Sequence, residues 1–212
     1  MVISPRNEDE TIIMKCELCP LSGTGYAFPR IKRGEGPKVM IIGEAPGKEE
    51  SKQHLAFVGR SGKLLNEWID DLDLNNYVIT NIVRHRPIKN NHDRPPTKQE
   101  IDACFPYLAR EIIMEKPDYI ILLGRSAMHG FRKYIDNSAV ELGINWKDKV
   151  KTVMKQTLAL KLRVHMTYEI EGLEGTIEVR TYPRVFVLWH PSYIIRGYST
   201  DNILELLKKQ IK

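Results

Sequence analysis

The chain has 212 residues, of which 42% are hydrophobic, so it can bury one substantial core without disulfides. Its 32 lysine and arginine residues against 27 aspartate and glutamate residues give a net charge of +5, which mildly favours a polyanionic partner. No apolar stretch has the length of a membrane span, and the amino terminus lacks the basic-then-apolar order of a secretory signal. We therefore expect one cytoplasmic domain over residues 1–212 that acts as a monomer and is not attached to a membrane.

The first half of the chain alternates short apolar runs with an amphipathic segment. The run Lys38–Ile42 predicts a buried strand that stops at Gly43. The segment Gly62–Leu72 has its apolar residues at helical spacing, which predicts a helix packed against a sheet. A second strand is predicted over Tyr77–Thr80, ending at Asn81.

The second half continues the alternation. Residues 87–96 are rich in proline, asparagine and charge, which is typical of a loop. Thr97 is followed three residues later by a glutamate, and this capping box predicts a helix that runs to Met114. Apolar runs at Tyr119–Leu123 and Arg184–Trp189 predict a third and a fourth strand.

Strands that alternate with helices indicate a parallel sheet covered on both faces. We therefore expect an α/β fold, a three-layer α/β/α sandwich around a central, mainly parallel, four-stranded sheet. Residues 147–181 are expected to form an insertion, because Leu160–Ile170 and Gly175–Tyr182 look like strands of a hairpin. In such sheets the functional site lies beyond the carboxyl ends of the strands.

Four motifs lie at these strand ends: Gly43–Gly47 (GEAPG), Phe57–Gly62 (FVGRSG), Thr80–Asn81 and His190–Ser192. In this order and spacing they resemble the family 4 uracil-DNA glycosylases, and the resemblance runs from about Cys16 to Tyr193. It implies a DNA-repair enzyme that hydrolyses the N-glycosidic bond of deoxyuridine in DNA. The products are free uracil and an abasic site.

Excision requires a pocket that holds the flipped nucleotide's flat ring and reads its Watson–Crick edge. The resemblance assigns Phe57 to stacking on the base, whereas core packing is its other reading. Asn81 offers an amide acceptor and donor that match N3–H and O4 of uracil and mismatch the reversed edge of cytosine. Gly43, Ala45 and Ser192 complete the predicted substrate-binding set.

Two residues are predicted to be catalytic. The resemblance implies that His190 donates a hydrogen bond to uracil O2, which stabilises the negative charge of the departing base. Glu44 is the carboxylate placed best to orient or deprotonate the attacking water, or to support the cationic sugar. Other glycosylase families have a catalytic aspartate near this place, where this chain has Ala45. Glu49 and Glu50 either share the work or are ordinary surface charges.

Beyond the His-Pro-Ser motif, an apolar pair followed by arginine suits a wedge that fills the space left by the flipped base, as in family members. The predicted DNA contacts are Arg60, Ser61, Tyr193, Ile194, Ile195 and Arg196. A basic loop offers further phosphate contacts through Arg84, Arg86, Lys89, Arg94 and Lys98.

Family 4 enzymes hold a 4Fe-4S cluster on four cysteines. This chain matches Cys16, Cys19 and Cys104 and has His85 in the remaining place. Three cysteines and one histidine can ligate an iron–sulfur cluster, and they are also an ordinary set for structural zinc. The resemblance favours the cluster, and either metal would pin the amino-terminal segment to the loop between Arg84 and Cys104.

Two other functions stay open at this stage. Ser51, His54 and Ala56 replace the aspartate, glycine and proline more common in the family, which leaves room for hypoxanthine or xanthine as the excised base. The basic loop and His85 would also permit a non-catalytic, metal-containing nucleic-acid-binding protein. The amide, carboxylate and imidazole retained in the predicted pocket favour the uracil glycosylase.

Overall fold

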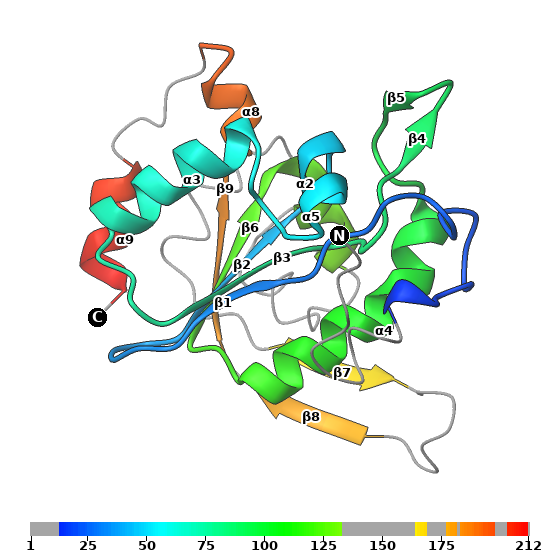
Figure 1. Ribbon diagram of the computed structural model, residues 1–212. Coiled ribbons are helices and arrows are strands. Elements are labelled where there is room, and N and C mark those ends of the chain that lie inside the picture. Colours follow the sequence, from blue (N-terminus) through cyan, green and yellow to red (C-terminus); the bar gives the residue numbers. More distant parts are fainter. Residues whose placement is uncertain (1–12, 133–163, 169–176, 182, 198–202, 212) are drawn as a thin grey trace.

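The computed structural model describes residues 13–132, 164–168, 177–181, 183–197 and 203–211. Its central sheet has five strands in the order β1-β3-β2-β6-β9 (Figure 1). The four predicted strands are confirmed, and each runs parallel to its neighbour among them. They are β2 (Val39–Gly43), β3 (Tyr77–Asn81), β6 (Tyr119–Leu123) and β9 (Arg184–Leu188).

The fifth strand, β1 (Arg30–Lys32), was not predicted. It pairs antiparallel with β3 at the edge of the sheet. The strand has only three residues, and the last two are exposed. It therefore lacks the buried apolar run by which the other strands were found.

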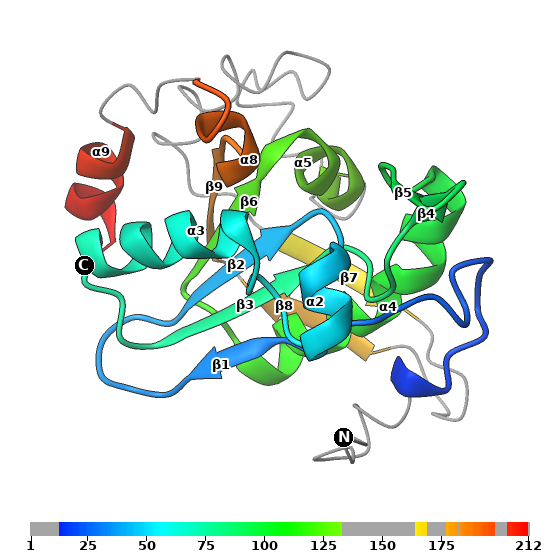
Figure 2. The ribbon, with the colours of Figure 1, turned by 45° about the horizontal axis from the view of Figure 1, so that its top comes forward.

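Helices cover both faces of the sheet, as predicted. One face is covered by α3 (Arg60–Asp71), with α9 (Ile203–Gln210) beside it, and the other by α4 (Lys98–Glu115) and α5 (Gly124–Arg132) (Figures 1 and 2). Every residue of β2 and β6 is buried, which a parallel sheet between two helical layers requires.

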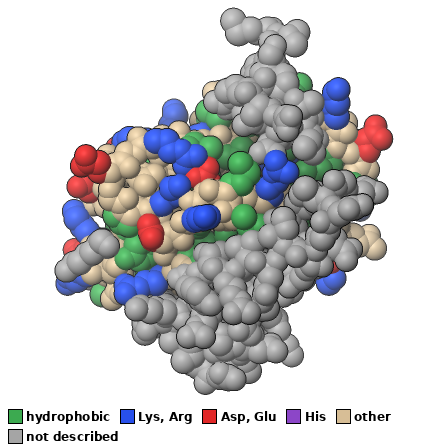
Figure 3. All heavy atoms as spheres, turned by 90° about the horizontal axis from the view of Figure 1, so that it is seen from below, with side chains coloured by type: hydrophobic (Ala, Val, Ile, Leu, Met, Phe, Trp, Pro, Cys, Tyr) green, Lys and Arg blue, Asp and Glu red, His purple; other side chains and the backbone are tan. Residues whose placement is uncertain are grey.

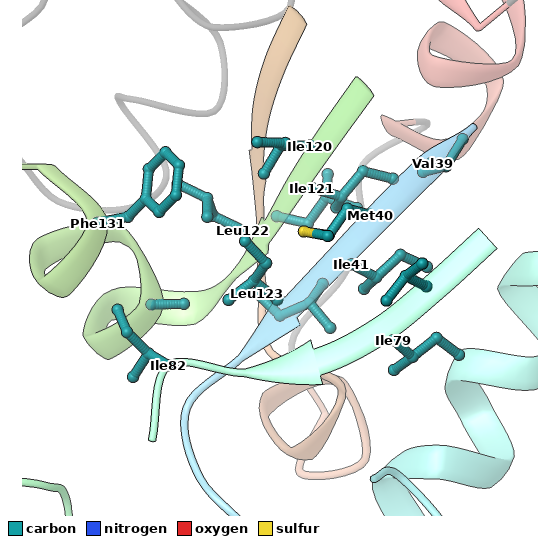
Figure 4. Close-up of a cluster of buried hydrophobic side chains, with 14 of the residues drawn as sticks. Val39, Met40, Ile41, Ile79, Ile82, Ile120, Ile121, Leu122, Leu123 and Phe131 are labelled. Carbon is teal, nitrogen blue, oxygen red and sulfur yellow. The ribbon is translucent and has the colours of Figure 1, made fainter. Parts of the chain in front are cut away.

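The core on the two faces is built from alternate residues of the same strands. Figure 4 shows Phe131 of α5 beside Leu122, with Ile82 on the same side of the sheet and Ile41 and Ile79 on the side of α3. The capping box at Thr97 is confirmed, since its hydroxyl accepts the Glu100 N–H and the Glu100 carboxylate accepts the Thr97 N–H.

Two short hairpins stand apart from the central sheet. The predicted loop at residues 87–96 contains β4 (Ile88–Lys89) and β5 (His92–Asp93), which pair antiparallel. Inside the two strand-like segments, β7 (Val164–Tyr168) and β8 (Ile177–Thr181) also pair antiparallel. The rest of residues 147–181 lies outside the described residues, so the insertion stays a prediction.

One face of the molecule mixes positive and negative side chains. On the face seen in Figure 3, Lys and Arg side chains are scattered among hydrophobic and acidic ones rather than gathered in one patch. None of the helices in the described ranges is long and apolar enough to cross a membrane.

Candidate active site

The carboxyl ends of the parallel strands meet at one edge of the sheet, where Gly43 of β2 is paired with Asn81 of β3. A Cβ atom on Gly43 would lie 2.4 Å from Cζ of Phe57 and 2.6 Å from Oδ1 of Asn81. Such distances are far inside van der Waals contact, so only glycine lets the ring and the amide share this corner.

A cavity of about 320 Å³ opens at this corner. Its lining includes the predicted pocket residues Ala45, Phe57, Asn81 and His190, together with Arg60 and Ser61. The structure therefore gathers residues from all four motifs around one hollow at the strand ends.

Asn81 is only 3% exposed, and no described residue hydrogen-bonds to its side-chain oxygen Oδ1. A buried polar atom without a partner costs about 1–3 kcal/mol, and native proteins rarely leave one without a reason. Because Asn81 lines the cavity, its Oδ1 is available to accept a hydrogen bond from a donor bound there.

Phe57 is held in a strained backbone conformation, with a φ angle of +55°. Strain of this kind costs a non-glycine residue about 1–3 kcal/mol and persists only where the surroundings impose it. The ring is 5% exposed, and its centroid lies 5.8 Å from that of the His190 ring. The ring therefore packs with the core and also forms a wall of the cavity.

His190 is the N-cap of the short helix α8 (Pro191–Ile194), and its Nδ1 accepts the Ser192 backbone N–H at 3.2 Å. Burial lowers the pKa of His190 to about 4, with a smaller contribution from Arg196. The ring is therefore neutral at physiological pH. With Nδ1 used as an acceptor, its single proton lies on Nε2, the donor that His190 can offer to the cavity.

Gly124 brings the end of β6 against His190. Its φ angle is +82°, and a Cβ atom there would lie 2.9 Å from Cβ of His190. The absence of a side chain therefore lets the strand end and the imidazole pack closely.

Glu44 is largely buried, and burial raises the pKa of its carboxyl group. A hydrogen bond from the Ser126 hydroxyl in the first turn of α5 acts in the opposite direction and lowers that pKa. Sequence reasoning missed Ser126. The available signal was its place two residues after the Gly124 strand end, at the same edge of the sheet as Glu44.

The two glutamates that follow along the chain, Glu49 and Glu50, both have ion-pair or hydrogen-bond partners. Glu49 is exposed and pairs with Lys52 at 3.1 Å. Glu50 accepts hydrogen bonds from the backbone N–H groups of Gly47, Val58 and Gly59. These contacts give each carboxylate a structural role, whereas Glu44 lines the second hollow beside His190.

A second hollow of about 560 Å³ adjoins the same edge, is lined by Glu44 and shares His190 with the first cavity. Its lining includes four of the predicted DNA-contacting residues, namely Arg60, Ser61, Ile195 and Arg196, and two predicted substrate-binding residues, Ala45 and Ser192. The hollow therefore leads from the catalytic candidates toward the candidate wedge.

The predicted wedge pair is divided by the structure. Ile195 is 39% exposed and lines the second hollow, whereas Ile194 packs against the core. Tyr193 stacks on Trp189 with ring centroids 5.8 Å apart, and the Arg196 guanidinium lies 4.6 Å from the Tyr193 ring centroid. The exposed apolar surface beside the site thus comes from Tyr193 and Ile195.

The proposed basic loop is less available for phosphate contact than the sequence predicted, because four of its five cations have carboxylate partners. Arg84 is also buried inside the protein. The pairs are Arg84–Glu111, Arg86–Asp93, Arg94–Glu100 and Lys98–Asp102. Lys89 remains exposed in the β4–β5 hairpin.

The predicted metal ligands lie where the amino-terminal segment crosses α4. Cys16 accepts the Tyr107 hydroxyl at 3.4 Å, and Cys104 accepts the Arg84 backbone N–H at 3.2 Å. Burial raises the pKa of Cys104 to about 11, and the charges of Cys16 and Cys19 add to the increase. The three sulfurs are therefore within electrostatic range of one another.

His85 follows Arg84 directly and is buried, with an isolated antiparallel bridge to Tyr26. Within the described ranges, no three His, Cys, Asp or Glu side chains converge closely enough to hold a single metal ion. Zinc requires its four donors at about 2.0–2.3 Å from one centre. An iron–sulfur cluster has several iron and sulfide atoms, so its ligands are further apart.

Comparison with known proteins agrees with the geometry. The model of the uracil DNA glycosylase superfamily matches residues 31–210. The type-4 uracil-DNA glycosylase of Sulfurisphaera tokodaii is 40% identical over 157 residues, covering 67% of this chain and 67% of the relative. That of Thermotoga maritima is 30% identical over 194 residues, covering 89% and 82%. That of Pyrobaculum aerophilum is 38% identical over 138 residues, covering 62% and 67%.

The chain therefore belongs to the uracil DNA glycosylase superfamily, and within it to the group of the type-4 enzymes.

The hydrogen bond from Ser126 to Glu44 leads to a prediction about the protonation of the Glu44 carboxyl group. Replacing Ser126 by Ala removes the donor that lowers the pKa of Glu44, so that pKa should rise. Carboxyl carbon NMR titration measures the value directly, with Glu44→Gln to assign the signal. Ser126→Thr keeps a hydroxyl and should restore the wild-type value. An unchanged titration in Ser126→Ala would contradict the contact.

Proposed function

We propose that this protein is a uracil-DNA glycosylase of base excision repair, which hydrolyses the N-glycosidic bond of deoxyuridine in DNA and releases uracil. The observation that carries the proposal is the buried Oδ1 of Asn81, which has no hydrogen-bond partner among the described residues and belongs to a cavity walled by Phe57. Proteins named type-4 uracil-DNA glycosylase among its relatives support the same activity.

Base recognition follows from the pocket lining. Uracil swung out of the duplex stacks on Phe57 and places its N3–H against Oδ1 of Asn81, while the amide N–H of Asn81 faces O4. Cytosine presents an acceptor and a donor at these two places, so it leaves Asn81 mispaired. Pairing of this kind discriminates strongly, because a wrong base leaves buried polar groups unsatisfied.

Bond cleavage leaves negative charge on uracil and positive charge on the sugar. The neutral His190 donates its Nε2–H to uracil O2 and stabilises the departing base. The hydrogen bond from Ser126 favours the ionised form of Glu44. Its negative charge supports the cationic sugar, and its oxygens orient the attacking water.

DNA is held along the second hollow. Arg60, Ser61 and Arg196 lie where the phosphates on either side of the flipped nucleotide would pass. Tyr193 and the exposed Ile195 fill the space that the base leaves in the stack.

The three departures from the family pattern give no support for a different base. None of Ser51, His54 and Ala56 is among the residues that line either hollow. Ser51 lies against Gly25, and His54 stacks on Tyr26 with ring centroids 4.2 Å apart. Ser51 and His54 therefore contact residues of the amino-terminal segment rather than the two hollows.

We infer that Cys16, Cys19, Cys104 and His85 hold a 4Fe-4S cluster with a structural role. The N–H and O–H donors at Cys104 and Cys16 fit the charge of thiolate ligands, and the resemblance to the family 4 enzymes favours a cluster over one zinc ion. When bound, the cluster joins the amino-terminal segment to α4. Cysteines that bind a metal rather than form disulfides suit the reducing cytoplasm, where the protein acts as a monomer.

Cleavage of a labelled oligonucleotide that carries one uracil, followed by alkali, tests the proposed activity. Wild type should give uracil-dependent breaks. Asn81→Ala and His190→Ala should each lose about 10²–10³ in rate, since each removes a buried group that meets the base. Glu67→Ala, an exposed change on α3, is the control and should cleave normally. Failure of folded, metal-replete wild type to cleave uracil DNA would refute the proposal.

Metal analysis tests the cluster. The purified protein should absorb in the visible charge-transfer region and contain iron and acid-labile sulfide in equal amounts. His85→Cys should keep the cluster and lower its reduction potential, because histidine ligation raises the potential. His92→Cys, an exposed change in the β4–β5 hairpin, should alter neither. One zinc per chain, without sulfide, would contradict the cluster.

A further inference from the structure

Phe57 is a strained residue in the middle of the candidate pocket, and strain at a site must be held by its surroundings. The Phe57 carbonyl oxygen accepts a hydrogen bond from Nη1 of Arg30 at 2.7 Å. Gly62, in the first turn of α3, lies so close that a Cβ atom there would be 1.9 Å from the same oxygen. One side of the strained residue is therefore fixed by an edge strand and a helix.

The other side is fixed by Glu50. Its Oε1 accepts the backbone N–H of Val58 at 3.1 Å and that of Gly59 at 2.8 Å, which are the two residues directly after Phe57. Its Oε2 accepts the N–H of Gly47 at 3.2 Å. Gly47 ends the turn that begins with Gly43 and contains Glu44, so one carboxylate connects the base-stacking loop to the catalytic turn.

The two glycines at these contacts make room for the carboxylate. A Cβ atom on Gly47 would lie 2.9 Å from Oε2 of Glu50, and one on Gly59 would lie 3.1 Å from Oε1. A larger residue at Gly47 would push the carboxylate away. Hydrogen bonds from N–H groups to an ionised carboxylate are shorter and stronger than those to a neutral amide.

We propose that Glu50 is a positioning residue for base excision: its carboxylate, together with Arg30, holds Phe57 in its strained conformation and sets the distance between the stacking ring and Glu44. The proposal rests on the proposed function. Glu50 acts through the backbone N–H groups of Gly47, Val58 and Gly59. Its role differs from that of the adjacent Glu49, which pairs with Lys52 at the surface.

A double-mutant cycle on single-stranded uracil DNA tests the proposal. Glu50→Gln keeps the size of the side chain but turns an N–H₂ group toward a backbone donor. Displacement of a reacting group by about 1 Å can cost about 10²-fold, so kcat should fall at least about tenfold and inhibition by free uracil should weaken. In a Phe57→Ala background the same change should have less than about threefold effect, because the residue that it positions is gone.

The measurement conditions, a control variant and a second test variant separate a positioning role from a general loss of stability. All rates are measured well below each variant's unfolding midpoint and at equal metal content. Glu67→Gln makes the same charge change at an exposed position of α3 and should leave kcat within about twofold of wild type. Arg30→Met releases the Phe57 carbonyl from the opposite side, should lower kcat in the same direction, and serves alone if Glu50→Gln does not fold.

Amide hydrogen exchange gives a readout that does not need activity. The Val58 and Gly59 N–H groups should exchange faster in Glu50→Gln than in wild type, while β2 amides stay protected. Unchanged exchange, a wild-type kcat, or effects of Glu50→Gln and Phe57→Ala that simply multiply would each overturn the positioning role. Wild-type protein that does not cleave uracil DNA would instead refute the proposed function. The exchange result would still show whether Glu50 holds the backbone of Val58 and Gly59.

Discussion

The site depends on one constraint, the parallel register that sets Gly43 of β2 beside Asn81 of β3 at the end of the sheet. Parallel strands end at the same edge, and here the edge position on one strand has no side chain. The space that a Cβ atom would fill is taken by the Phe57 ring and the Asn81 amide. A stacking face and a hydrogen-bonding edge therefore meet at one point, which is what recognition of a flat, edge-coded base requires.

The electrostatics of the site follow from the same burial. Desolvation disfavours charge on both catalytic candidates, so it makes His190 neutral and raises the pKa of Glu44. For His190 this is useful, because a neutral ring whose Nδ1 accepts the Ser192 N–H has its proton on Nε2. For Glu44 it works against the ionised form, and the Ser126 hydrogen bond offsets part of the effect.

Sequence reasoning found the elements whose signals are local. The four parallel strands appear as apolar runs, and the helix from Lys98 appears through its capping box. It missed β1, which has three residues and no apolar run, and the hydroxyl of Ser126, which meets Glu44 only after folding.

Contacts between distant residues account for the other differences. The basic loop looked available for DNA because the sequence does not show that Arg84 is buried against Glu111 or that Arg94 is paired with Glu100. The wedge appeared as one apolar pair, but a helix turn directs Ile194 to the core and leaves Ile195 exposed. Glu50 looked like surface charge until three backbone N–H groups were found on its carboxylate.

The most direct test of base recognition is NMR observation of the Asn81 side-chain amide during titration with free uracil and, separately, with cytosine. We expect uracil to shift the Asn81 N–H₂ signals until the shift saturates, whereas cytosine at the same concentration should leave them in place. Equal shifts with both bases, or none with uracil in a protein that cleaves uracil DNA, would contradict the claim that Asn81 reads the base.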